Sequence, residues 1–296
     1  MKLFRKKYQQ MIKYIGGICV ALSMATSLSA EAVSMHCDND TTEISTLVAS
    51  LAADPSTPVG KRIVLAAESF IGKGADDFAL TDSVGGLRLN VDTFTPMSFV
   101  NSAIAAGKSS MVDGGGWRAF NKELTNYSCR RGEDTGLHSI FYHTSDWIGD
   151  NIYRGNLIEL TDRYTGDRSL TASLDYMSVN RDKYPALAND SVYDRVRMTE
   201  MGFRSHKIPY LPKQAIGSKD LLADMRDGDI IVMVSSKDRS DWYRFGIVKM
   251  ESDGPHMIYY DVKDQQVVVT PEPLKRFFAR EAKYFNGFRW LRVAGN

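Results

Sequence analysis

The chain has 296 residues, of which 43% are hydrophobic and 25% are charged, an ordinary globular composition with material for one large domain or two small ones. The chain has 37 basic and 36 acidic residues. Five of the basic residues and one of the acidic residues lie in the first 32 positions, so the rest of the chain carries 32 basic and 35 acidic residues. A slightly acidic chain without a basic run lacks the electrostatic footprint of a nucleic-acid-binding protein.

Residues 1–32 have the pattern of a secretory signal peptide. A positively charged start precedes an apolar stretch of about 14 residues, IGGICVALSMATSL, and the small residues Ala30 and Ala32 offer two cleavage positions. The apolar stretch is shorter than the roughly 20 residues of a spanning helix, so we expect no stable membrane span after cleavage. An uncleaved anchor is the alternative. The mature chain is therefore expected in a bacterial periplasm.

Segments of the first half have the apolar spacing of helices. Apolar residues recur at helical positions over residues 41–54 and 58–72. Another helix is predicted from Thr95, which can cap it, through Pro96 at the first helical position to a stop at Gly107.

Strand-like runs fill the last third of the chain. Short stretches rich in β-branched and aromatic residues alternate with turns such as Asp227-Gly228, and residues 273–284 predict one helix among them. The predicted strands are residues 227–234, 243–250, 256–262, 265–270 and 287–293. Together the segments predict an α+β fold, in which a helical N-terminal half packs on an antiparallel sheet formed by the C-terminal third.

Two cysteines, Cys37 and Cys129, remain after removal of the signal segment. An oxidising compartment permits them to pair, and closing so long a loop would add about 4–5 kcal/mol of stability if the bond is unstrained. The alternative is that Cys129, beside Arg130 and Arg131, is a reactive thiol with a lowered pKa. No HExxH motif and no paired Cys and His spacing occurs, so we expect no metal and no other cofactor.

Candidate binding residues gather in YHTSDWIGDNIYRGNLIELT, residues 142–161. This mixture of aromatic, charged and amide side chains suits the binding of a polar ligand. The alternative is an ordinary helix start, with an acidic residue near the helix N-terminus and the indole packed inward. The candidates are Tyr142, His143, Asp146, Trp147, Asn151 and Arg154.

This segment resembles the HYxSDWIxDNxxRG signature of a bacterial family of NlpC-type, papain-like N-acetylmuramoyl-L-alanine amidases. In the same order, LRLNVDTFTPMSFVNSAIA resembles the family's nucleophile block, DGDIIVMV its GDII strand and YRFGIV its HVGI strand. The resemblance implies a papain-like domain over residues 58–296, after an N-terminal extension at 33–57. It also implies a cysteine at a helix N-terminus that attacks the amide between N-acetylmuramic acid and L-alanine, helped by a strand histidine.

Both reacting residues of the family are replaced on a gapless alignment. The cysteine position holds Pro96, which has no nucleophilic atom, and the histidine position holds Arg244, which stays protonated. We therefore expect a catalytically degenerate, monomeric, cell-wall amidase-like protein. It is expected to bind a muropeptide, a peptidoglycan fragment or a cell-wall partner, with Arg244 facing Pro96 and offering its charge to a peptide carboxylate.

Two other functions remain open from the sequence. One is an active peptidoglycan amidase that uses Ser98 or Cys129 as a substitute nucleophile together with a histidine. The other is a structural or interaction protein with no ligand in the cleft.

Overall fold

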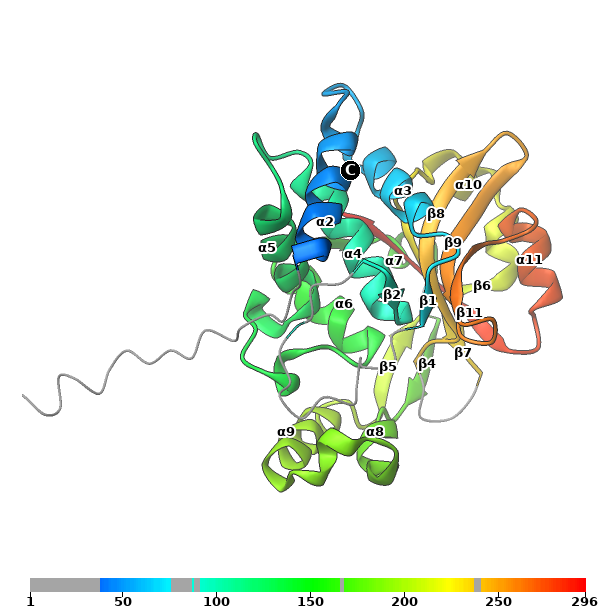
Figure 1. Ribbon diagram of the computed structural model, residues 1–296. Helices are drawn as coiled ribbons and strands as arrows, with labels where there is room; N and C mark the ends of the chain where they lie inside the picture. Colours follow the sequence, from blue (N-terminus) through cyan, green and yellow to red (C-terminus); the bar gives the residue numbers. More distant parts are fainter. Residues whose placement is uncertain (1–37, 76–86, 88–90, 166–167, 237–240) are drawn as a thin grey trace, which may run out of the picture. The chain divides into compact units, whose positions relative to one another are not determined.

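The computed structural model describes residues 38–75, 87, 91–165, 168–236 and 241–296 (Figure 1). The predicted signal segment, residues 1–32, and Cys37 lie outside these residues. Helices precede most of the strands along the chain, and the strands of the main sheet pair in the antiparallel sense. The predicted combination of helices with an antiparallel sheet is confirmed.

In the described part of the chain, seven strands form the main sheet. Its order is β10, β9, β8, β7, β11 and β3, and β6 also pairs with β11. The strands are β3 (Leu157–Glu159), β6 (Leu211–Pro212), β7 (Ile230–Ser235), β8 (Arg244–Glu251), β9 (Gly254–Asp261), β10 (Gln266–Val269) and β11 (Phe285–Val293). The strands predicted in the last third are confirmed, whereas β3 and β6 come from earlier residues and are too short to show a strand pattern.

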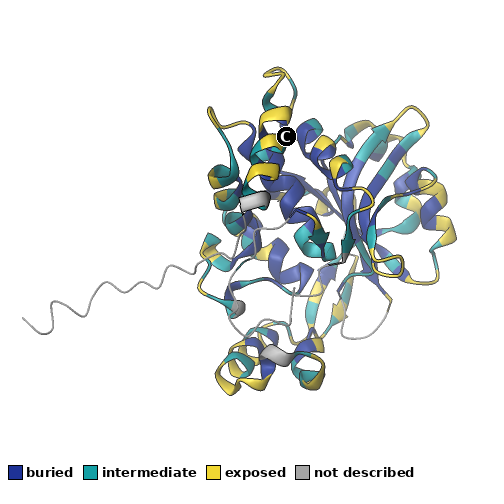
Figure 2. Cartoon of the chain, in the orientation of Figure 1, coloured by how far each residue is buried: buried dark blue, intermediate teal, exposed yellow. Residues whose placement is uncertain are grey.

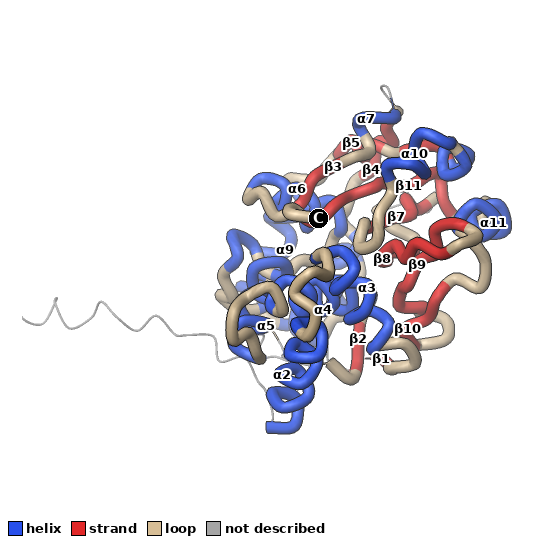
Figure 3. The backbone as a smooth tube through the Cα atoms, turned by 90° about the horizontal axis from the view of Figure 1, so that it is seen from above, coloured by secondary structure: helices blue, strands red, loops and turns tan. Residues whose placement is uncertain are grey.

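Helices of the N-terminal half pack on one face of this sheet and on one another (Figure 3). Phe99 and Ile104 meet Phe245 and Ile247 of β8 in a single core, to which Ile44 also belongs. Ile44 lies within the predicted N-terminal extension. The helices are α2 (Asp38–Ala52), α3 (Val59–Ser69), α4 (Pro96–Ser109), α5 (Trp117–Ser128) and α6 (Thr144–Tyr153).

Gly107 lies inside α4, because the helix continues to Ser109. A Cβ atom at position 107 would stand only 2.5 Å from Cγ1 of Ile63 in α3. The predicted helix stop at Gly107 is therefore wrong, and the glycine instead allows α3 and α4 to approach closely.

The opposite face of the sheet packs on α10 (Lys219–Asp224) and α11 (Leu274–Arg280), with the 3₁₀ helix η5 (Lys213–Gly217) between β6 and α10. Side chains of strand β7 pack on both faces of the sheet. Ile230 and Val232 join the core of α4, whereas Ile231 and Met233 join the core of α11. Figure 2 shows the strands of the sheet as almost continuously buried, with the exposed residues on the outer helices and turns.

A separate lobe, residues 169–209, is inserted between β3 and β6. Its two short strands pair only with each other among the described strands, and its helices enclose a small apolar cluster of Met177, Leu187 and Val196 (Figure 1). Its elements are β4 (Ser169–Ala172), α8 (Tyr176–Val179), η3 (Arg181–Lys183), η4 (Pro185–Ala188), α9 (Asp190–Met201) and β5 (His206–Pro209).

The remaining elements are short. A parallel pair joins β1 to β2, and short helices connect the larger elements. No helix among the described residues is both long and apolar enough to cross a bilayer. The short elements are β1 (Gly74–Ala75), β2 (Thr93–Phe94), η1 (Arg130–Gly132), η2 (Leu137–Ser139) and α7 (Asp162–Thr165).

Candidate functional site

Reciprocal hydrogen bonds close the first turn of α4. Thr95 Oγ1 accepts from the backbone N–H of Ser98 at 3.1 Å, and Ser98 Oγ accepts from the backbone N–H of Thr95 at 2.8 Å. Pro96 stands at the first helical position, where an N–H would have no partner within the helix. The predicted helix start is confirmed. The Ser98 hydroxyl, predicted as a substitute nucleophile, takes part in the hydrogen bonds that cap this helix.

Arg244 lies on the face of the sheet that α11 covers. Its Nη1 donates to Asp261 Oδ2 at 2.6 Å, and its guanidinium lies 5.8 Å from the ring centre of Phe277. The next residue, Phe245, packs in the core of α4 instead. Because successive side chains of a strand alternate between faces, the expectation that Arg244 faces Pro96 is wrong. Its charge is balanced inside the protein.

Three predicted binding residues line one small cavity at the start of α6. Tyr142, His143 and Asp146 surround a space of about 10 Å³, which is close to the minimum for one water molecule. Arg130 and Glu200 also line it, and neither was predicted as a binding residue. No local pattern reveals Glu200, because it lies 57 residues from the histidine that it contacts.

His143 and Glu200 form a buried pair, with 3.1 Å between Nε2 and Oε1. Burial disfavours the imidazolium, but the hydrogen bond to Glu200 and the nearby carboxylates of Asp241, Glu200 and Asp146 outweigh it, so the pKa of His143 is raised. Burial likewise favours a neutral Glu200. The hydrogen bonds from His143 and Ser178 outweigh that cost, and the pKa of Glu200 is lowered. The pair therefore favours the doubly charged form.

Acidic side chains hold the first turn of α6. Asp241, which is buried, accepts from the backbone N–H of Ser145 at 2.5 Å through Oδ2. Asp146 accepts two hydrogen bonds from Arg130 in a side-by-side arrangement, one of them 2.6 Å from Nη1 to Oδ1. Carboxylates near a helix N-terminus are stabilised by the unpaired N–H groups there.

Trp147 and Asn151 are hydrogen-bonded inside the protein. The fully buried indole of Trp147 donates through Nε1 to Asn101 Oδ1 of α4 at 3.0 Å. Asn151 Nδ2 donates to the backbone carbonyl of Tyr127 at the end of α5, at 3.2 Å. These contacts fasten α6 to both neighbouring helices and leave the two predicted binding residues facing the interior.

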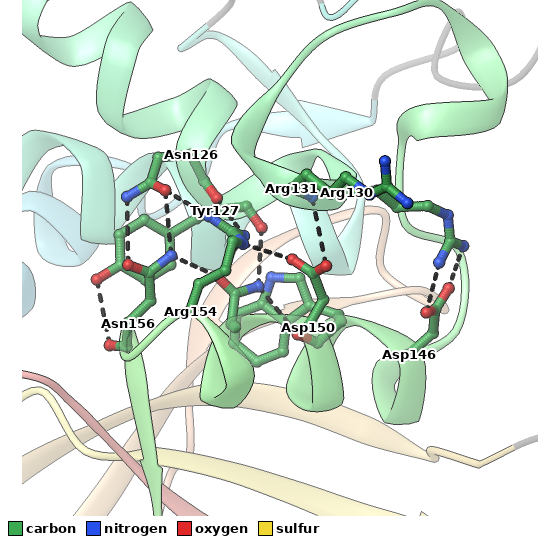
Figure 4. Close-up of polar contacts among 10 residues, drawn as sticks. Asn126, Tyr127, Arg130, Arg131, Asp146, Asp150, Arg154 and Asn156 are labelled. Carbon is green, nitrogen blue, oxygen red and sulfur yellow. Dashed lines mark hydrogen bonds and ion pairs between the residues drawn. The ribbon is translucent and has the colours of Figure 1, made fainter.

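Arg154 is the centre of a polar network between α5 and α6 (Figure 4). Its Nε donates to Asp150 Oδ2 at 2.6 Å, and its Nη2 donates to the backbone carbonyl of Asn126 at 2.6 Å. Asn156 adds a 3.2 Å hydrogen bond to Asn126. The guanidinium is thus directed into the protein, so we assign Arg154 a structural role.

Cys129 is a free thiol buried at the end of α5. Burial, assisted by the negative charge of Asp134, raises the pKa of this thiol to about 12. That direction is opposite to the one predicted for a reactive thiol, and it argues equally against Cys129 as a substitute nucleophile. Pairing with Cys37 stays a prediction.

Cys129 is expected to resist alkylation in the native protein and to react after unfolding, because burial blocks access and keeps the thiol protonated. Peptide mass spectrometry of the full chain, treated with iodoacetamide with and without urea, measures the modified fraction at each cysteine. Labelling of Cys129 in the native protein would contradict the buried thiol. A linked Cys37–Cys129 peptide in the unreduced digest would establish the predicted disulfide instead.

Within the described residues, no group of three or more His, Cys, Asp or Glu side chains is arranged to hold a metal ion. The charges around the cavity are mainly balanced in pairs, His143 with Glu200 and Arg130 with Asp146. The arrangement offers hydrogen-bond donors and acceptors for a polar group.

A family of known proteins matches most of this sequence. A family model described as AmiA-like, N-acetylmuramoyl-L-alanine amidase-like, matches residues 70–284. No curated protein matches the chain.

Solved structures are similar over most of their length. An N-acetylmuramoyl-L-alanine amidase from Bacteroides uniformis has a TM-score of 0.70 and 23% identity, covering 79% of this chain and 98% of that one. A putative xylanase from Bacteroides fragilis has a TM-score of 0.68 and 25% identity, covering 77% and 100%. A protein from Legionella pneumophila has a TM-score of 0.63 and 16% identity, covering 86% and 95%. All three share the fold with this chain.

Proposed function

This chain belongs to the N-acetylmuramoyl-L-alanine amidase-like family, and from that membership we propose that it binds peptidoglycan fragments without cleaving them. We further propose that its fold is of the papain-like, NlpC type, in which the nucleophile stands at a helix N-terminus. The predicted signal segment supports a place in the periplasm, and we propose that the protein acts there as a monomer.

The first turn of α4 carries this proposal. The residue that the resemblance aligns with the family nucleophile is Pro96, and the two hydroxyls beside it are engaged with each other's backbone N–H groups. The histidines of the described ranges have other partners: His138 contacts Arg195, His143 contacts Glu200, His256 contacts Thr270 and Asp253, and His206 of β5 packs against Phe203. A hydroxyl without a positioned base is a poor nucleophile.

The start of α6 is the proposed place for one polar group of the ligand, because its cavity of about 10 Å³ admits no larger part. Tyr142 and Asp146 line its small cavity, and Arg130 there carries a buried Nε that has no hydrogen-bond partner. A peptide stem offers carbonyl and carboxylate acceptors for such a donor. Binding of this kind needs only these polar groups and no nucleophile.

The full chain, incubated with defined muropeptides that include anhydro forms, is expected to bind them and to release no stem peptide. Mass spectrometry of the mixture tests cleavage, and isothermal titration calorimetry tests binding. Arg130→Gln is expected to weaken binding at least about tenfold, because it removes the charged donor that this proposal assigns to the ligand. Arg131→Gln, at the next position, exposed and outside the cavity lining, is the matched control.

Two outcomes would contradict the proposal. Release of free stem peptide by the unmodified chain would show that it is a working amidase. Absence of any heat of binding would show that the tested muropeptides are not its ligands. A Pro96→Cys, Arg244→His double variant is expected to stay inactive as well, because residue 244 faces α11.

A further inference from the structure

The lobe of residues 169–209 meets the rest of the chain in two regions, an apolar cluster that it shares with Val234 of β7 and a set of contacts at the start of α6. Tyr142 packs against its apolar cluster, and Arg195 Nη1 lies 3.1 Å from the ring nitrogens of His138. The buried pair of His143 and Glu200 joins α6 to α9 beside these contacts. The cavity of about 10 Å³ lies at the same junction, so packing there is incomplete.

Glu200 connects three parts of this junction through one carboxylate. Its Oε1 accepts from the backbone N–H of Met177 at 3.0 Å as well as contacting His143, and its Oε2 accepts from the backbone N–H of Ser178 at 3.1 Å. The residue is buried. Loss of the positive charge on His143 therefore weakens the contacts that join α8 and α9 to the start of α6.

His143 can lose its charge in the folded protein at a pH above the range of a free imidazole, because its pKa is raised there. Acidic groups face it from several elements, and these favour its protonated form. Arg130 neutralises one of them and lines the same cavity, and His138 lines the cavity from η2. The acidic groups are Asp146 on α6, Glu200 on α9 and Asp241 before β8.

We propose that the His143–Glu200 pair is a pH-responsive latch. It holds the lobe of residues 169–209 against the start of α6 while both partners are charged, and this contact weakens when His143 loses its proton. This inference concerns the protein without ligand and does not require that a ligand binds, although His143 and Glu200 line the same cavity as the proposed ligand site. The small apolar cluster of the lobe makes its opening less costly than unfolding of the main core.

The direction of the effect follows from the pKa shift of His143. Its folded-state pKa lies above the unfolded value of 6.5, so its contribution is fully present below about pH 6.5 and is lost as the pH rises through the folded-state pKa. Glu200 has a lowered pKa, so its contribution is present above its unfolded value of 4.5 and is lost at lower pH. The latch is therefore closed most firmly in mildly acidic solution.

Hydrogen exchange of the full chain tests the latch at the two amides that donate to Glu200, those of Met177 and Ser178. Their protection factors, corrected for intrinsic exchange, are expected to fall several-fold between about pH 6 and about pH 9. In His143→Gln, which keeps a side-chain donor but does not titrate, protection is expected to stay constant. His138→Gln, which removes a histidine of the same cavity without a bond to Glu200, should behave like the unmodified chain.

A flat profile in the unmodified chain, or an equal fall in His143→Gln, would overturn the proposal. If His143→Gln loses protection at every pH, the Glu200→Gln variant provides the deciding test. In that variant the titration of the His143 ring, followed by NMR, must move to lower pH, because the carboxylate that favours the protonated imidazole is gone. An unmoved transition would equally overturn the latch.

Discussion

Replacement of Asp229 by alanine is expected to lower the free energy of unfolding by about 3–5 kcal/mol. Its carboxylate is fully buried and accepts from Arg292 Nε at 2.7 Å, Arg292 Nη2 at 2.8 Å and Trp290 Nε1 at 2.9 Å. Among the described residues, the variant leaves the buried guanidinium of Arg292 with the more distant carboxylate of Asp224, at 3.6 Å, as its charged partner. A buried charge that loses its close partner is strongly destabilising.

Urea unfolding followed by circular dichroism and tryptophan fluorescence measures this loss. Asp229→Asn is expected to be milder, because an amide keeps the shape and one acceptor. Asp182→Ala, at an exposed position on η3, is the control and should change stability by less than about 0.5 kcal/mol. A loss below about 1 kcal/mol in Asp229→Ala would show that Arg292 finds water or another partner.

Replacement of Trp147 by alanine is expected to cost about 3–5 kcal/mol, the range for truncation of a large buried aromatic side chain. Its ring is fully buried and meets Phe245 edge to face, with 5.2 Å between ring centres. Trp147→Phe retains most of this packing but leaves Asn101 Oδ1 without its donor, at a cost of about 1–3 kcal/mol. Chemical denaturation of both variants gives the two values.

Tyr153 provides the matched control, because it lies on the same helix with 90% of its surface exposed. Tyr153→Ala should unfold like the unmodified chain, within about 0.5 kcal/mol. Muropeptide binding measured on the folded fraction should also survive in Trp147→Phe. Loss of binding with unchanged stability would instead make Trp147 a ligand contact, as the sequence first suggested.

Local chemistry made the start of α4 predictable. Thr95, Pro96 and Ser98 form a cap with their immediate neighbours, so their sequence spacing is sufficient to identify it. The strand of GDII type was predictable for the same reason, because five consecutive apolar side chains, residues 230–234, follow the turn at Gly228.

The facing direction of Arg244 was not predictable in this way. Strand β8 is buried on both faces around residues 245–248, so no polar and apolar alternation indicates which side chains face α4. The contact of His143 with Glu200 depends on the folding back of an inserted lobe. Gly107 looked like a helix stop because its actual constraint, Ile63, lies in a different helix.

The internal network of Arg154, Asp150 and Asn126 affects what can be inferred from a sequence match to the segment around α6. Side chains that fasten two helices together are under selection for foldability, whether or not a nucleophile is present elsewhere. A search for the pattern SDWIxDNxxR therefore finds proteins that share this helix packing, and a match gives no information about catalytic activity. Sorting such a collection into enzymes and non-enzymes requires the residue at the start of α4 to be read separately.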